Sequence, residues 1–339
     1  ASLARSNGHS RDLGAMLNSW LQITPLKQLN FRTQFATNAH FRRSDGYTPQ
    51  FYIDALEQST LSDVSRQSQE WMDWNWTNTL TYMDTFREKH NFTAMAGFTA
   101  ERYAWFNTYA ARAAVPSDLE IMREVSAGTQ NQRANGDTSY NTLASFLGRI
   151  MYNYDNRYYV TASLRADGSS RFPEGSKYAY FPSVSVSWRI IGEEFMKDQE
   201  VFDNLKLRAG WGKVGNQNIS NDATLTLLGQ SDYVFGATPQ RVTGTSVSTV
   251  GNNQLRWETV EDWNVGIDMS VLKSRLDFTF EYFQKKSHDM LYSKQNVLVA
   301  GYPNWNSTLW MNIGSMQATG WEMSLNWRDK VSDFAYNVG

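Results

Sequence analysis

The sequence alternates between apolar and polar residues over long stretches, most regularly at positions 157–190. Apolar residues occupy every second position from Val160 to Ala166, with serine, threonine, arginine and aspartate near or between them. The pattern returns from Val184 to Ile190. Strict alternation is typical of a β-strand with one apolar and one polar face. Because a Gly-, Ser- and Pro-rich segment separates the two stretches, we predict a β-hairpin here.

Similar stretches along the chain bring the predicted total to about twelve strands. No long helical pattern lies between them; a short helical connector is predicted at 191–204, and a short helix is the alternative to irregular structure at 117–125. The chain stops at Gly339 within a further strand-like stretch, so we expect it to be a fragment of a longer protein. The other predicted strands are 17–24, 29–43, 74–82, 92–98, 142–154, 205–211, 257–271, 275–286, 309–320 and 321–328.

The links between the predicted strands alternate in length. Short turns follow the first, third, fifth, ninth and eleventh strands, and long polar segments follow the second, fourth, sixth, eighth and tenth. In an up-and-down antiparallel sheet, this rule places the long loops at one end. Transmembrane β-barrels are built in this way, with an apolar outer band edged by aromatic residues, and a closed barrel satisfies its backbone groups in lipid. We therefore predict an all-β fold, part of an antiparallel up-and-down transmembrane β-barrel.

The aromatic residues and the charge agree with this prediction. Trp188, Trp211, Trp257 and Trp327 lie near predicted strand ends, as interfacial girdles require. A large soluble β-sandwich with an aromatic core is the alternative, but such a fold rarely keeps one loop-length rule through so many strands. The net charge of −2 gives no argument for nucleic-acid binding. The absence of cysteine excludes disulfide scaffolds and thiolate metal sites.

No motif in the sequence indicates an enzyme. The four histidines lack metal-ligand spacing, so we predict no metal site and no cofactor. The adjacent carboxylates Glu193 and Glu194 are interpreted as the solvated start of a short helix rather than a catalytic pair. The segment GWGKVGNQ lacks phosphate-loop spacing, and no nucleophile elbow occurs.

Five blocks between Asn153 and Trp327 have the sequences NYDNRYYVTASLRADGSSRF, YFPSVSVSWRI, LKLRAGWGKVGNQNI, LRWETVEDWNVGIDMSVLKSRLDFTFEYFQKKSHDML and NIGSMQATGWEMSLNW. In this order they resemble SusC/RagA-like TonB-dependent transporters of Bacteroidetes outer membranes. Residues 1–152 are similar only in their general pattern of paired strands joined by a short turn of the Pro-Leu-Lys type. The resemblance implies a barrel of about 22 strands with a plugged lumen. Residues 1–339 would then be part of one β-barrel domain, with the plug domain and the C-terminal strands absent from this chain.

The resemblance also implies a function in the bacterial outer membrane, namely TonB-dependent import of oligosaccharide or oligopeptide nutrients. The expected partners are a SusD-like surface lipoprotein, TonB acting through the missing N-terminal region, outer-membrane lipid, and a glycan or peptide substrate. Nucleic acid is not expected. Two alternatives stay open: a passive porin-like barrel, and a secreted β-sheet module that binds carbohydrate.

Two groups of residues are candidates for binding. The first consists of charged residues on the predicted lumen face, which could contact the plug or the substrate or simply form cross-strand pairs: Arg149, Arg165, Asp167, Arg189 and Arg208. The second consists of aromatic residues in the predicted extracellular loops, which could stack on sugars, seal against a partner or pack within their own loops: Trp105, Tyr233, Phe235, Tyr302 and Trp305.

Overall fold

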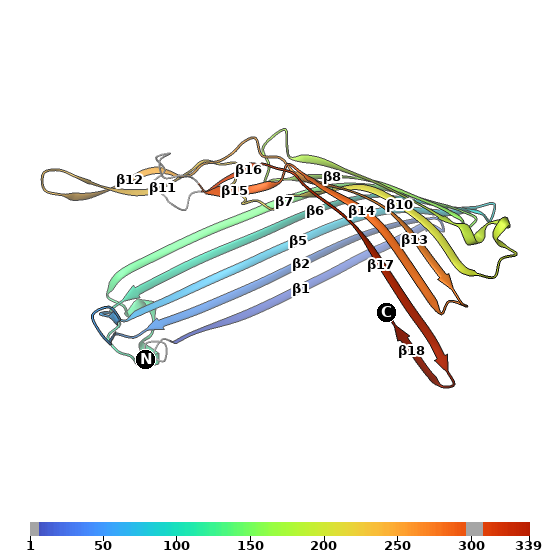
Figure 1. The fold of residues 1–339 in the computed structure, drawn as a ribbon. Coiled ribbons are helices and arrows are strands. Elements are labelled where there is room, and N and C mark those ends of the chain that lie inside the picture. The colour runs from blue at the N-terminus through green and yellow to red at the C-terminus, as the bar shows by residue number, and fades with distance from the viewer. Residues whose placement is uncertain (1–6, 296–307) are drawn as a thin grey trace. The chain divides into compact units, whose positions relative to one another are not determined.

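The computed structural model describes residues 7–295 and 308–339. Its main element is a twelve-stranded antiparallel sheet in which the strands follow one another in chain order, so the predicted up-and-down topology is confirmed (Figure 1). The strands are β1 (Asn7–Leu26), β2 (Leu29–Thr48), β5 (Asp63–Phe86), β6 (His90–Ala113), β7 (Gln130–Tyr154), β8 (Tyr158–Ser169), β9 (Tyr178–Arg189), β10 (Phe202–Asn216), β13 (Glu258–Val271), β14 (Leu276–His288), β17 (Met316–Val331) and β18 (Phe334–Val338).

The remaining elements lie in the links between these strands. Three small two-stranded sheets form there: β3 (Phe51–Tyr52) with β4 (Gln58–Ser59), β11 (Leu227–Phe235) with β12 (Gln240–Thr249), and β15 (Leu291–Gln295) with β16 (Thr308–Asn312). In place of the short helix considered for 117–125, the structure has two single 3₁₀ turns, η1 (Glu120–Met122) and η2 (Val125–Ala127). In place of the short helix predicted for 191–204, it has two more, η3 (Ile190–Gly192) and η4 (Glu194–Met196).

The chain divides into two compact units. The first comprises Ala1–Trp20, Gln34–Trp76 and Ala100–Thr142, and the second comprises Leu21–Thr33, Thr77–Thr99 and Leu143–Gly339. In the first unit, Tyr47, Val64 and Val115 form a small buried cluster. In the second unit, a larger cluster lies among the long links and contains Phe172, Phe181, Ile219, Ala223, Leu255 and Trp257.

The short links are tight turns. Asp155 and Asn156 between β7 and β8 both have positive φ, as a two-residue hairpin turn requires. Positive φ also occurs in the turns at 87–88, 272–274 and 332. Every one of these residues is non-glycine, so the paired strands hold the turns in a conformation that most side chains disfavour.

Several predicted strand boundaries were wrong. β6 continues to Ala113 and β7 begins at Gln130, whereas the sequence pattern fades in this region. Residues 130–138 of β7 are exposed throughout, so no apolar face imposes alternation there. The predicted strand 309–320 is broken at Gly314, whose φ is +87°. Its first part is β16, its second part belongs to β17, and β18 is the twelfth strand of the main sheet.

The apolar face of the second unit is exposed. One row of directly opposed residues runs Val160, Val186, Ala209, Val265, Tyr282 and Trp321 across β8, β9, β10, β13, β14 and β17. Val265 is 50% exposed and Trp321 is 65% exposed. A soluble sandwich would bury this row in its core, so the exposed apolar band favours a membrane-facing wall.

Candidate functional site

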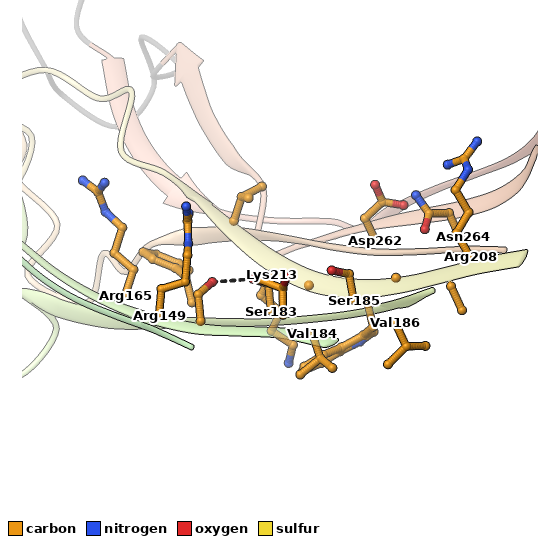
Figure 2. A pocket seen from close by; sticks show the side chains of 18 of the residues that line it. Arg149, Arg165, Ser183, Val184, Ser185, Val186, Arg208, Lys213, Asp262 and Asn264 are labelled. Atoms are coloured by element: carbon orange, nitrogen blue, oxygen red, sulfur yellow. Dashed lines mark hydrogen bonds between the residues drawn. The ribbon is translucent and has the colours of Figure 1, made fainter. Parts of the chain in front are cut away.

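The opposite face of the second unit carries a cavity of about 1100 Å³. Figure 2 shows Arg149, Arg165 and Arg208 on one side of the strands, and Val184 and Val186 pointing away on the other side. We call the cavity face of β7–β10, β13, β14 and β17 the polar wall. Its side chains at the cavity are Arg149, Tyr159, Thr161, Ser163, Arg165, Asp167, Ser183, Ser185, Ser187, Lys206, Arg208, Asp262, Asn264 and Lys285.

The centre of the polar wall is formed by small residues. Thr161, Ser185 and Gly210 lie directly opposite one another, and so do Ser163, Ser183 and Gly212. The Ser163 and Ser183 hydroxyls are 2.6 Å apart. The glycines leave room for neighbouring side chains, since a Cβ at Gly210 would lie 2.7 Å from Asn264 Oδ1 and a Cβ at Gly212 would lie 3.0 Å from Ser183 Cβ.

One ion pair lies on β8 beside this strip. Arg165 donates from Nε to both carboxylate oxygens of Asp167, at 2.6 and 2.8 Å, and from Nη2 to the Ser145 hydroxyl at 3.1 Å. Asp167 is buried, while the Arg165 side chain is 43% exposed. The carboxylate of this pair is therefore buried, and part of the guanidinium is exposed to the cavity.

A second network joins three strands. Arg208 on β10 donates to Glu281 on β14 and, at 3.4 Å, to Asp268 on β13, while Asn264 donates to Glu281 at 3.2 Å. Gly266 lies opposite Arg208, and a Cβ at this position would be 2.9 Å from the guanidinium carbon. Glycine at 266 therefore leaves the room that the guanidinium needs.

The five predicted wall residues have different surroundings. Arg149, Arg165, Asp167 and Arg208 all line the cavity, and Arg189 lies on the same face beside Lys206 but outside the cavity lining. Arg208 forms the cross-strand pairs that the sequence allowed, with Asp268 and Glu281, whereas Arg165 and Asp167 pair with each other within β8. Arg149 is exposed and has no ion-pair partner within residues 7–295 and 308–339. Contact of any of them with plug or substrate stays a prediction.

The predicted loop aromatics are also distributed differently from expectation. Trp105 lies in β6 rather than in a loop, because that strand continues further than its sequence pattern. Tyr233 and Phe235 lie in β11, with their ring centroids 4.7 Å apart, and both are exposed. Tyr302 and Trp305 fall outside the described residues.

Trp257 corrects another prediction. It is 6% exposed, contacts the rings of Phe172 and Phe181, and donates from its indole nitrogen to the Lys177 carbonyl at 2.9 Å. It is therefore part of the buried core under the long links and not an interfacial girdle. Trp211 does lie on the apolar face, where its indole nitrogen donates to Glu261 at 2.8 Å.

Glu193, interpreted from sequence as a solvated residue, is instead buried at the short-turn end of the second unit. Hydrogen bonds from Tyr158 and Trp188, and then the nearby Arg157 guanidinium, hold the pKa of its carboxyl below its usual range. Arg157 also donates to Asp155 in the β7–β8 turn at 2.6 Å. Glu193 therefore fastens the β9–β10 connector to the neighbouring turn.

The first unit has a smaller charged cavity of about 220 Å³ near the end of β2. Arg66 lies between Asp45 and Glu124 there, donating at 2.6 Å to the former. Tyr47 donates to Asp118, and its burial together with this hydrogen bond raises the pKa of the phenol to about 12. These contacts hold the link between β6 and β7 against the end of β2.

Several wall residues were not singled out from the sequence. Lys206, Asp262, Asn264 and Lys285 alternate with apolar residues in strands that were predicted correctly. Extending the face assignment along each strand would have found them. What the sequence could not supply is the register, which brings residues from six strands into common rows.

Within residues 7–295 and 308–339, no group of three or more His, Asp or Glu side chains could hold a metal ion. Among the same residues, no helix is both long enough and apolar enough to cross a membrane.

An antiparallel wall with an exposed apolar face, a charged opposite face, tight turns at one end and long links at the other defines a segment of an outer-membrane β-barrel. The chain belongs to the family described as TonB dependent receptor-like, beta-barrel, whose model matches residues 4–339. Members of this family are receptors and transporters rather than enzymes, and the protein is an outer-membrane protein.

Individual relatives agree with this assignment. TonB-dependent receptor P26 of Formosa agariphila is 29% identical over 308 residues, which cover 91% of this chain and 30% of that protein. TonB-dependent receptor SusC of Bacteroides thetaiotaomicron is 38% identical over 233 residues, which cover 66% of this chain and 22% of SusC. The predicted resemblance to SusC/RagA-like proteins is confirmed. The chain spans less than a third of the length of these two relatives.

Solved structures show the same fold. The RagAB peptide importer in its open-open state matches with a TM-score of 0.85 at 26% identity, covering 98% of this chain and 36% of that chain. The structure of the RagAB peptide transporter matches with a TM-score of 0.86 at 24% identity, covering 97% and 35%.

Proposed function

We propose that the protein imports oligomeric nutrients, either oligopeptides or oligosaccharides, across the outer membrane by TonB-dependent transport. The observation that carries this proposal is the two-faced wall: an exposed apolar face suited to lipid and a charged, serine-rich face suited to a water-filled path. Membership of the TonB-dependent receptor barrel family supports it.

The proposal includes the rest of a longer protein. Because the chain covers about a third of the RagAB structures, residues 1–339 are proposed to be part of one barrel domain, with the plug domain and the other strands elsewhere. TonB would act through the N-terminal region, and a SusD-like surface lipoprotein would cover the extracellular mouth. In this mechanism the polar wall performs no chemistry and provides the surface along which plug and substrate move.

Uptake by cells that express the full-length parent protein tests the proposal. Labelled oligopeptides and oligosaccharides should enter only while the inner-membrane proton gradient is intact and TonB is present. Uptake that persists after an uncoupler or after deletion of TonB would support the porin-like barrel instead. Co-purification in mild detergent should also recover an outer-membrane lipoprotein, and its absence would contradict the proposed partnership.

A further inference from the structure

The apolar face of the second unit has a defined edge on the side of the long links. Four consecutive rows of described residues on β10, β13 and β14 carry no charge on this face, and the last of them contains Trp211, Trp263 and Gln284. On β13 this uncharged stretch extends from Trp263 to Val271. Its length suits a tilted strand that crosses the hydrocarbon core, which takes about 9–11 residues. The tryptophan row therefore marks the edge of the lipid-facing band.

The next row of the same face is charged. Lys213, Glu261 and Lys286 lie directly opposite one another in it, on β10, β13 and β14, and His288 follows on the same face of β14. The Glu261 carboxylate accepts a hydrogen bond from the Trp211 indole at 2.8 Å. The same carboxylate lies 3.8 Å from the Lys213 ammonium and 3.9 Å from the Nε2 atom of His288. One carboxylate therefore serves two of the three basic side chains.

Lys286 is the cation of this row that the chain does not neutralise. Its side chain is exposed, and it forms no ion pair with another residue among 7–295 and 308–339. Further toward the long links, Arg256 and Asp289 bind each other at 2.6 Å and add no net charge, while Glu258 lies opposite Asn216 on the polar wall. Among the described residues of β8–β10, β13 and β14, the apolar face carries no other lysine or arginine than the two in this row. Two lysines against one carboxylate give the edge of the band a net positive charge.

The charged row and the apolar band together fit a ligand that has an anionic head and apolar chains. Val265 and Tyr282, two rows from the charged one, lie opposite each other in the exposed band. The Trp263 ring lies beside Tyr282, with the ring centroids 5.5 Å apart. Tryptophan and lysine at the edge of such a band are typical of the headgroup level of a membrane. Because the long links of outer-membrane barrels face the outside, this edge lies in the outer leaflet.

We propose that Lys213, Lys286 and His288 bind the phosphate of a lipid headgroup in the outer leaflet, while the acyl chains of that lipid lie against the apolar band. Lys286 is the main contact, because it is exposed and has no carboxylate of its own. Lys213 lies two strand spacings away, about 10 Å, and the four-carbon stems of the two lysines are flexible enough for both ammonium groups to approach one phosphate. Glu261 holds Lys213 and His288 in place and limits the positive charge of the site.

The test measures lipid binding by the full-length parent protein in detergent micelles, with native mass spectrometry. The probes are bisphosphorylated lipid A and the same lipid with both phosphates removed. The wild-type protein should bind the phosphorylated form more tightly. Lys286→Gln should lower that affinity about fivefold, the factor expected for one lysine near an anionic headgroup, and should leave the affinity for the dephosphorylated form unchanged. Equal affinity of the wild-type protein for the two lipids would overturn the proposal.

Two further variants of β13 and β14 serve as matched comparisons. Lys285→Gln removes the same charge from the adjacent residue, which faces the cavity rather than lipid, and should leave lipid binding unchanged. Glu261→Gln removes the carboxylate of the charged row, keeps an acceptor for the Trp211 indole, and should raise the affinity for the phosphorylated lipid. Equal losses in Lys285→Gln and Lys286→Gln, or a loss in Glu261→Gln, would overturn the assignment of the phosphate to this row.

Heat-modifiable mobility on gels verifies that each variant assembles. If Lys286→Gln does not assemble, high salt should reduce the wild-type preference for the phosphorylated lipid because it screens exposed charges, and a salt-independent preference would overturn the proposal. Inorganic phosphate at the concentration of the lipid should displace none of it, and displacement would show a site for free anions instead. Uptake by cells tests the import function separately, so the lipid site and the import function can fail independently.

Discussion

Adjacent residues on β13 provide a sharp test of the two-faced wall. Val265 lies in the middle of the exposed apolar band, and Asn264 faces the cavity, where it donates to Glu281. Lysine at a lipid-facing position near the bilayer midplane costs about 2–4 kcal/mol. We therefore expect Val265→Lys to lower the free energy of unfolding by this amount, which is a factor of about 30 to 1,000 in the folding equilibrium.

Asn264→Lys places the same charge one residue away, beside the Glu281 carboxylate and in water. We expect a change of no more than about 1 kcal/mol, because lumen-facing substitutions escape the lipid penalty and an exposed ion pair contributes little.

The assay is urea unfolding of the full-length protein in phospholipid vesicles, followed by tryptophan fluorescence and by heat-modifiable mobility. The difference between the two variants is the quantity that matters, since both introduce the same side chain. Equal destabilisation by the two substitutions, or a larger effect at position 264, would refute the assignment of faces.

Three further predictions concern the two ends of the strands. Glu193→Gln removes the negative charge of the ion pair with Arg157. Because folding lowers the pKa of Glu193, its stabilising effect is present above the usual pKa of 4.5 and is lost as pH falls below it, so thermal unfolding scans of wild type and variant should converge at low pH. Tyr47→Phe breaks the hydrogen bond to Asp118, which should cost about 1 kcal/mol and speed amide exchange in residues 118–127, as hydrogen–deuterium exchange would measure. Trp257→Ala should cost about 3–5 kcal/mol in the core under the long links, so that hydrogen exchange rises in the link residues 172–177, 219–226 and 250–255 while the strands of the main sheet stay protected. Equal rises in the links and in the strands would contradict a separate core.

The alternation of apolar and polar residues in the sequence predicted the strands that have one apolar face. β8 and β9 were found at nearly their observed bounds because apolar residues such as Val160 and Val186 alternate there with serine and threonine. The method failed where both faces of a strand are exposed. Residues 130–138 of β7 continue the ladder with no apolar face, so only hydrogen bonding to neighbouring strands defines them.

The sequence predicted which charged residues lie on the polar face but not which partners they contact. Arg149, Arg165, Asp167 and Arg208 could be placed on the polar face from their positions within single strands. Their partners could not be placed, since the Arg208 pair with Glu281 joins strands 73 residues apart in the sequence. Glu193 was misjudged for the same reason, because its burial depends on Trp188 and on a turn from another hairpin.

The tight turns have an evolutionary consequence. A two-residue turn whose residues both have the left-handed conformation, such as Asp155 and Asn156, has no spare residue to absorb an insertion. One inserted residue would slip the register of its strands and turn their side chains to the other face. The opposite links are long and accept additional residues at small entropic cost. Insertions can therefore accumulate at the rim with the long links, while the rim with the tight turns keeps a fixed geometry.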